Sequence, residues 1–291
     1  MIGSLLETVT SETPGGAAPG VPSPEPLIRE PDSGRARIGD LRAWLPVVIA
    51  IGGRDLKSRY KQSLLGPAWT VFQPLALLGC FFVGFHSVAH VKTGAVPYLL
   101  FALTGLAVWS FVQSAWMSSS GSIVNSYALV RWTACPRIAL PLAAVISNAP
   151  TLLVTVLAAL LASAIEGDVW AGWCAIPLVL VWLLALCTAG CVFLGVASVR
   201  ARDLISALPF LLQALMFLSP VAYDTSRLGN PLRSIVALNP LDGLINLWRW
   251  SVLHTPVDTG AVISGLTVTA ALAVVAWRMF VAMNGRIADE I

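Results

Sequence analysis

Six stretches of this 291-residue chain contain no Asp, Glu, Lys or Arg. They are residues 62–91, 93–130, 138–165, 169–199, 204–223 and 259–277. A helix needs about 20 apolar residues to cross the hydrocarbon core of a bilayer, and each stretch is long enough or one residue short of it. Trimmed of their polar ends, the stretches predict six membrane spans, near residues 68–90, 97–117, 139–164, 173–198, 204–222 and 259–280. We therefore expect an all-α integral membrane protein.

The distribution of basic residues predicts the orientation of these spans. An even number of spans places both termini on the same side of the membrane. With the N-terminus in the cytoplasm, fourteen of the 18 Lys and Arg residues fall in cytoplasmic segments. Cytoplasmic loops carry such an excess, so both termini are expected to be cytoplasmic. The net charge of only +3 does not suggest a nucleic-acid partner.

The scarcity of ionisable groups excludes several functions. Only 11% of residues are charged, against about 25% in soluble domains, which argues against a water-soluble enzyme. The spans are nearly empty of the ionisable groups that proton- or sodium-coupled transport requires: His86 and His90 lie near the outer end of the first span and Asp203 at the inner border, which disfavours such coupling. The chain has no H-E-x-x-H, G-x-S-x-G or Walker A motif, and its five cysteines show no C-x-x-C spacing. We expect no enzymatic activity, no metal and no cofactor bound by this chain; any energy for transport must come from another polypeptide.

The segments before the first span differ in character. Residues 1–37 are rich in Pro, Gly, Ser, Thr and Glu and lack the pattern of a signal peptide, which predicts a disordered cytoplasmic tail. Residues 38–66 combine apolar residues at helical spacing with basic ones. This pattern predicts an amphipathic helix in the inner membrane interface, or more simply a juxtamembrane anchor. Asp55 and Arg59 have the spacing of an ion pair within one helix.

Two further segments predict short helices outside the spans. Residues 125–137, bounded by Asn125 and Pro136, predict a cytoplasmic helix that docks into a soluble subunit or rests on lipid headgroups. After Asn239-Pro240, apolar residues predict a helix of about 13 residues, too short to span. It is expected to be re-entrant or interfacial and to form part of an outer gate, because irregular backbone at membrane depth needs protein or water around it.

Three parts of the sequence, in this order, resemble a known family. They are Arg54–Trp69 with Gln73-Pro74; Asn125–Leu142; and Val199–Asp203 with Leu218–Tyr223, Leu238–Pro240 and Arg249. The chain is similar, over about residues 40–285, to ABC-transporter permeases that export cell-surface polysaccharides and teichoic acids, including O-antigen permeases. It departs from the family's pattern at Trp132–Cys135, where contacts to a partner are expected to differ, and at Ala201, where a tyrosine is common.

The resemblance implies a permease in the bacterial inner (plasma) membrane. Residues 67–285 would form its six-span domain and residues 286–291 a cytoplasmic C-terminus. Two copies of the chain would join two copies of a separate ABC ATPase, which would bind ATP and Mg²⁺, and would export a lipid-linked glycan. The resemblance implies ATPase-coupling residues Asn125, Tyr127, Leu129, Arg131, Trp132 and Arg137, and outer-gate residues Pro220, Tyr223, Asn239, Pro240 and Arg249.

Aromatic and basic residues give two further sets of candidates. Sugar C–H faces stack on aromatic rings, so the channel-lining candidates are Trp69, Phe72, Trp109, Phe111 and Trp116; the alternative is an aromatic belt facing lipid. The diphosphate of a lipid-linked glycan attracts cations, so the binding candidates on the interface helix are Arg54, Lys57, Arg59 and Lys61. Binding to bulk anionic lipid is the alternative for this basic cluster.

Other classes of function remain open at this point. A permease for a drug or a smaller lipid would have a similar layout, but the R-D-L-K-x-R-Y and N-P sequences favour polymer exporters. A membrane-bound glycosyl- or acyltransferase should carry polar catalytic clusters in its loops, and none is found. A passive channel or scaffold would not need two cytoplasmic docking helices.

Overall fold

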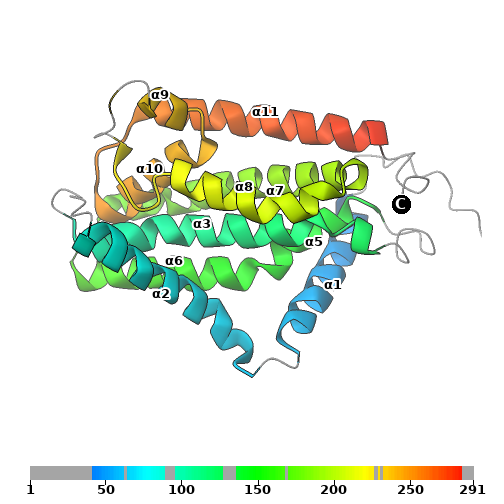
Figure 1. Ribbon diagram of the computed structural model, residues 1–291, viewed down its shortest axis with the longest axis horizontal. Coiled ribbons are helices and arrows are strands. Elements are labelled where there is room, and N and C mark those ends of the chain that lie inside the picture. Colours follow the sequence, from blue (N-terminus) through cyan, green and yellow to red (C-terminus); the bar gives the residue numbers. More distant parts are fainter. Residues whose placement is uncertain are drawn as a thin grey trace, which may run out of the picture. The chain divides into compact units, whose positions relative to one another are not determined.

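The computed structural model describes residues 41–61, 64–88, 96–126, 136–167, 170–225, 229 and 232–283, which all lie in one compact unit (Figure 1). Over these residues the regular structure is entirely helical. The longer helices are α1 (Leu41–Tyr60), α2 (Trp69–Phe81), α3 (Tyr98–Ser120), α5 (Ala139–Ser147), α6 (Ala149–Ile165), α7 (Ile176–Arg200), α8 (Asp203–Leu218), α10 (Pro240–Leu253) and α11 (Thr259–Met283). Short helical segments are η2 (Gly66–Ala68), η3 (Phe82–Val88), η4 (Val124–Ser126), η5 (Ala171–Ala175) and α9 (Leu232–Val236).

Five of the six predicted spans are confirmed as helices long and apolar enough to cross a membrane. They are Gly66–Phe85, Tyr98–Ser120, Ala139–Ile165, Ala171–Arg200 and Thr259–Met283. The fifth predicted span, 204–222, is instead the 16-residue helix α8, about 24 Å long at 1.5 Å per residue. It ends early because Ser219 precedes Pro220 and takes an extended conformation, with φ −97° and ψ 142°.

Helix α3 lies at the centre of the packing. It contacts α2, α5, α6, α7, α8 and α10, and 72% of its span is buried inside the protein. Trp109 and Phe111 on this helix are fully buried. Trp116 lies over Gly190 of α7, where any side chain would overlap the indole ring. The close approach of α3 and α7 therefore depends on the missing side chain at Gly190.

The outer helices expose broad apolar faces. Only 17% of the α2 span and 22% of the α11 span are buried inside the protein. On α8, Phe210 and Leu211 are 79% and 54% exposed. Faces of this size on a membrane protein require lipid or another protein as their surroundings.

The third predicted span, 139–164, is a helix with a break. Helix α5 ends at Ser147 and α6 begins at Ala149, and Pro150 at the start of α6 has no N–H to donate to the preceding turn. The Asn148 N–H bonds to the Val145 carbonyl instead of continuing the α-helical pattern to Ala144. The break leaves the polar side chain of Asn148 buried between helices.

Helix α1 falls within the predicted 38–66 segment. It continues unbroken through Pro46 and both of its glycines. Val48 and Ile51 are buried, and α1 packs on α5, with Gly52 against Ile146. In Figure 1, α1 and α2 diverge from the short link between them. Residues of both helices line one cavity.

Gly243→Ala tests the contact between α10 and α11. A Cβ at this position would overlap the backbone carbonyl of Ala261, which cannot move without shifting α11. We expect the substitution to destabilise the fold by about 1–3 kcal/mol, measured as a lower melting temperature of the purified protein in detergent. Gly79→Ala is the matched control, because a Cβ there meets no atom within 4 Å. Equal melting of the two variants would contradict this account.

Candidate functional site

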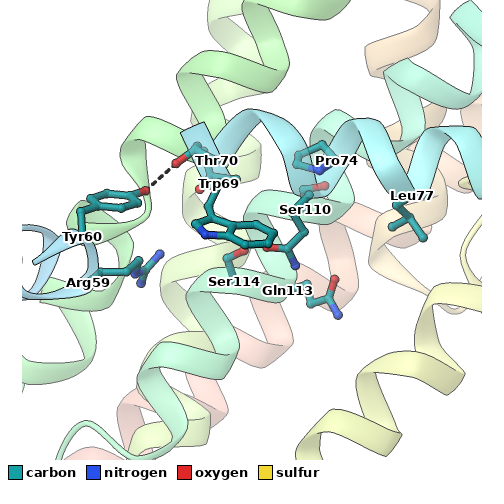
Figure 2. Close-up of a pocket in the computed structure, with 11 residues that line it drawn as sticks. Arg59, Tyr60, Trp69, Thr70, Pro74, Leu77, Ser110, Gln113 and Ser114 are labelled. Carbon is teal, nitrogen blue, oxygen red and sulfur yellow. Dashed lines mark hydrogen bonds between the residues drawn. The ribbon is translucent and has the colours of Figure 1, made fainter. Parts of the chain in front are cut away.

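A cavity of about 270 Å³ lies where the end of α1 meets α2, α3 and α6 (Figure 2). Its lining combines one cation, one indole ring, two amides and several hydroxyl groups. The lining residues are Arg59, Tyr60, Trp69, Thr70, Gln73, Pro74, Leu77, Ser110, Gln113, Ser114 and Thr151. We refer to this cavity as the inner pocket, because the predicted orientation places the end of α1 at the cytoplasmic side.

Hydrogen bonds fix the cation at the edge of the inner pocket. Arg59 Nη1 donates to Asn148 Oδ1 at 2.7 Å, and Nη2 donates to Ser118 Oγ at 3.0 Å. The Tyr60 and Thr70 hydroxyl groups lie 2.5 Å apart and join α1 to α2. Among the described residues, the guanidinium thus bonds to neutral oxygens, and its positive charge remains available to an anion.

Asn148 is held in one orientation by its other contacts. Its Nδ2 donates to the Ala144 carbonyl at 2.7 Å and to Ser118 Oγ at 3.2 Å. The first of these bonds satisfies the carbonyl that the break between α5 and α6 leaves without its usual backbone donor. Since both amide hydrogens point away from Arg59, the Oδ1 atom is the part that faces the guanidinium.

The predicted ion pair between Asp55 and Arg59 is wrong. Asp55 Oδ1 accepts hydrogen bonds from Arg54 Nε and Nη2, at 3.0 and 2.8 Å. Arg59 turns instead to two neutral side-chain oxygens, those of the buried Asn148 and the half-buried Ser118. The predicted basic cluster is therefore divided: Arg54, Lys57 and Lys61 line a separate groove along α1, and Arg59 alone lines the inner pocket.

The five aromatic candidates occupy different environments. Trp69 is 46% exposed and its ring lies in the inner pocket, edge-on to the exposed Phe72 at a centroid distance of 5.4 Å. Trp109 and Phe111 pack within the core. Trp116 donates its indole N–H to the Cys187 carbonyl at 3.2 Å. Of the five, the structure brings only Trp69 to the inner pocket.

The predicted ATPase-coupling residues are described only in part. Asn125 is exposed and Arg137 is half-buried. Tyr127, Leu129, Arg131 and Trp132 lie outside the described residues, as do the tail 1–37 and the C-terminus 286–291. Their roles stay predictions.

At the other end of α3, the structure brings the predicted outer-gate residues together. Arg249 on α10 is 4% exposed; its Nη2 donates to the Val221 carbonyl at 2.7 Å and to the Phe101 carbonyl at 3.1 Å. The guanidinium carbon lies 3.5 Å from the centre of the Phe101 ring, a cation–π contact. Gly105 leaves the space for this arrangement, since a Cβ there would overlap the Val221 carbonyl. We call this group the outer cluster.

Asn239 begins α10 and ties it to the turn after α8. Its side chain accepts from the Leu241 N–H at 3.0 Å, the capping bond of an N-cap residue, and donates to Ser219 Oγ at 2.8 Å. Pro240 follows at the first position of the helix, which proline favours. Tyr223 lies in the same turn and donates to the Phe217 carbonyl at 3.1 Å. The 14-residue α10 agrees with the length predicted for this helix.

Burial shifts the ionisation of two side chains on α10. Burial lowers the pKa of Arg249 to about 9, which still leaves it cationic at neutral pH. Burial, together with the charge of Asp258, raises the pKa of Asp242 to about 6, although hydrogen bonds from Thr225 and Asn246 and the charge of Arg249 oppose the rise. Arg249 of the outer cluster and the neighbouring Asp242 are therefore ionisable groups in buried positions.

Sequence reasoning missed several residues of both groups. Gln113 lines the inner pocket, Asn148 and Ser118 hold Arg59 at its edge, and Phe101 and Gly105 belong to the outer cluster. An amide or hydroxyl side chain within a charge-free stretch could have pointed to Asn148, Ser118 and Gln113. Polar groups at membrane depth usually have a hydrogen-bond partner or a functional role. No sequence pattern indicated which of these side chains would converge.

Comparison with known proteins identifies relatives over most of the chain. The model of a family described as ABC-2 type transporter matches residues 46–253. The O-antigen export system permease protein RfbA of Klebsiella pneumoniae is 25% identical over 70% of this chain and 78% of its own length. RfbA of Myxococcus xanthus is 25% identical (73% and 82%), and the polysialic acid transport protein KpsM of Escherichia coli is 24% identical (73% and 83%).

Arg249→Met tests the outer cluster. Loss of the guanidinium removes the donor to the buried Val221 carbonyl, and an unsatisfied buried polar group costs about 1–3 kcal/mol. The Phe101 carbonyl keeps its hydrogen bond from Thr104 Oγ1. We expect a lower melting temperature and faster amide hydrogen exchange in residues 219–225. Arg233→Met is the control, because Arg233 makes an exposed ion pair with Asp258 and should change neither quantity. Unchanged exchange in Arg249→Met would contradict the assigned role.

Asp242 predicts a pH dependence of stability. The folded state binds this proton more tightly than the unfolded chain, whose carboxyl titrates near the ordinary pKa of 3.8. The free energy of unfolding should therefore fall as the pH rises from about 4 to about 6, by at most about 3 kcal/mol. Asp242→Asn should flatten this part of a melting-temperature profile. Asp203→Asn, at the start of α8, should leave it in place; a profile unchanged by Asp242→Asn would refute the assignment.

Proposed function

Since the chain belongs to the ABC-2 type transporter family, we propose that it is the transmembrane subunit of an ATP-driven exporter of lipid-linked polysaccharide. The cargo would be of the O-antigen, galactan, capsule or teichoic acid type, and it would move from the cytoplasmic to the outer side of the inner membrane. The relatives support this class, since they are named for O-antigen export and polysialic acid transport.

The inner pocket is the observation that carries the proposal. It brings the cation of Arg59 together with an exposed indole and two amides, where the end of α1 meets α2, α3 and α6. A lipid-linked glycan presents a diphosphate next to sugar rings. Charge-assisted hydrogen bonds suit the diphosphate, and an indole with neighbouring amides suits a sugar.

The working exporter would contain two copies of this chain and two copies of an ABC ATPase subunit. The apolar faces of α2, α8 and α11 are left exposed by the rest of the chain, so they are available for association with a second copy as well as for contact with lipid. Within each copy, α8 would serve as a sixth, short span and keep both termini cytoplasmic. Helices α9 and α10 would be re-entrant from the outer side, and the outer cluster would form part of a gate there.

Coupling to ATP hydrolysis would pass through the cytoplasmic segments. Helix α1 packs on α5, and the segment 125–137 directly precedes α5 in the chain. A displacement of either by the ATPase would therefore move α5 relative to α6 at the break beside Asn148. Since Asn148 binds Arg59 directly, movement of these helices would change the shape of the inner pocket.

Co-expression with candidate ABC ATPase subunits tests this function. We expect a stable four-chain complex whose ATP hydrolysis in lipid nanodiscs changes when a lipid-linked glycan is added. Arg59→Ala should weaken the response to the glycan, and Arg137→Ala should weaken the coupling to the ATPase; Arg233→Ala is the control for loss of an arginine outside both sites. Failure of the well-folded chain to recruit any ATPase would overturn the proposal in favour of a passive channel or scaffold.

A further inference from the structure

We propose that the inner pocket is a saccharide-binding subsite for the sugar ring adjacent to the lipid diphosphate. The inference rests on the proposed function and specifies which part of the cargo the chain recognises. Trp69, Gln73 and Gln113 would bind the ring, and Arg59 would bind the neighbouring phosphate.

Two amides in spanning helices provide the first argument. Gln73 lies on α2 and Gln113 on α3, and both line the pocket. Neither side chain hydrogen-bonds to another described residue. Gln73 is exposed and Gln113 is half-buried, so both amides are accessible from the pocket, and each offers two donors and one acceptor oxygen. A ligand rich in hydroxyl groups would satisfy both.

Hydroxyl side chains extend the same polar wall. Ser110 and Ser114 lie on the same face of α3 as Gln113, and Thr151 lines the pocket from α6. Figure 2 shows the Ser114 and Gln113 side chains beneath the Trp69 ring. Polar groups from three separate helices thus converge on one cavity, whereas the opposite face of α2 carries exposed apolar residues such as Val71 and Leu75.

The indole of Trp69 supplies the apolar surface that a sugar requires. Its ring is nearly half exposed, and the edge contact with Phe72 holds it in place. The face of an aromatic ring carries partial negative charge, which attracts the C–H groups on one side of a sugar ring. The amides then lie where they can bond to the hydroxyl groups at the rim of that ring.

The size of the pocket indicates a fragment of the cargo. Its volume of about 270 Å³ lies just below the range of about 300–1,000 Å³ that is typical of pockets for complete small ligands. The rest of the glycan and the lipid must therefore lie outside it. The pocket fits a subsite for one part of a long molecule.

Arg59 fixes which part of the glycan this is. A guanidinium has five N–H donors, and the described contacts to Asn148 and Ser118 use two of them. The remaining donors could bind a phosphate without breaking the bonds that position the side chain. Because Arg59 and Trp69 line the same cavity, a phosphate on Arg59 would place the first attached sugar at Trp69.

Binding of two matched probes tests the subsite. The full-length chain in nanodiscs is titrated with a short polyprenyl diphosphate that carries one hexose, and with the same polyprenyl diphosphate without a sugar. We expect the wild-type protein to bind the glycosylated probe about tenfold more tightly. Gln113→Leu and Gln73→Leu should each reduce this preference to about twofold or less. Arg59→Gln should lower the affinity for both probes by a similar factor.

A control variant and a second measurement separate the outcomes. Gln213→Leu replaces an exposed glutamine on α8 outside the pocket and should retain the full preference; melting temperatures verify that each variant is folded. Equal binding of the two probes by the wild-type protein, or an undiminished preference in Gln113→Leu, would overturn the subsite. If the ATPase complex still responds to a lipid-linked glycan in that case, the proposed function stands without the subsite; if no ATPase is recruited, both fail.

Discussion

The hydrogen bonds of the Asn148 side chain are the interactions on which the arrangement around the end of α1 depends. Pro150 prevents a continuous helix, and the amide of Asn148 compensates for the break by donating to the Ala144 carbonyl. Its oxygen then accepts from Arg59 at 2.7 Å, which joins α1 to the third span. A local defect in one helix thus positions the cation, and with it the inner pocket between α1, α2, α3 and α6.

Both ends of α3 use an arginine bonded to neutral oxygens. Arg59 bonds to a side-chain amide and a hydroxyl, and Arg249 bonds to two backbone carbonyls beneath an aromatic ring. The difference is exposure: Arg249 is buried, so its hydrogen bonds serve packing, whereas Arg59 borders a cavity. The same chemistry therefore joins helices at both ends of α3, but only at Arg59 does it leave the cation at the edge of a cavity.

Particular helices show where sequence reasoning succeeded. Five of the six spans predicted from the charge-free stretches are confirmed, and Asn239-Pro240 correctly predicted the start of α10. Both predictions succeed because hydrophobic length and helix capping depend on neighbouring residues. The length of α8 was overestimated, because hydropathy does not register that the residue before Pro220 leaves the helix. The partner of Arg59 was misassigned, because the spacing rule considers one helix and ignores a buried acceptor on another.

The sequence by itself determined that this is an α-helical membrane protein, located five of the segments that are long enough to span, and indicated the family that it resembles. Those properties follow from the local pattern of apolar, charged and capping residues. The tertiary structure decided that Arg59 lines a different pocket from Arg54, Lys57 and Lys61. It also decided that Trp69 borders a cavity while Trp109 packs in the core, and that Gln73 and Gln113 line one pocket. These outcomes depend on how helices distant in sequence rotate and pack, which no local pattern specifies.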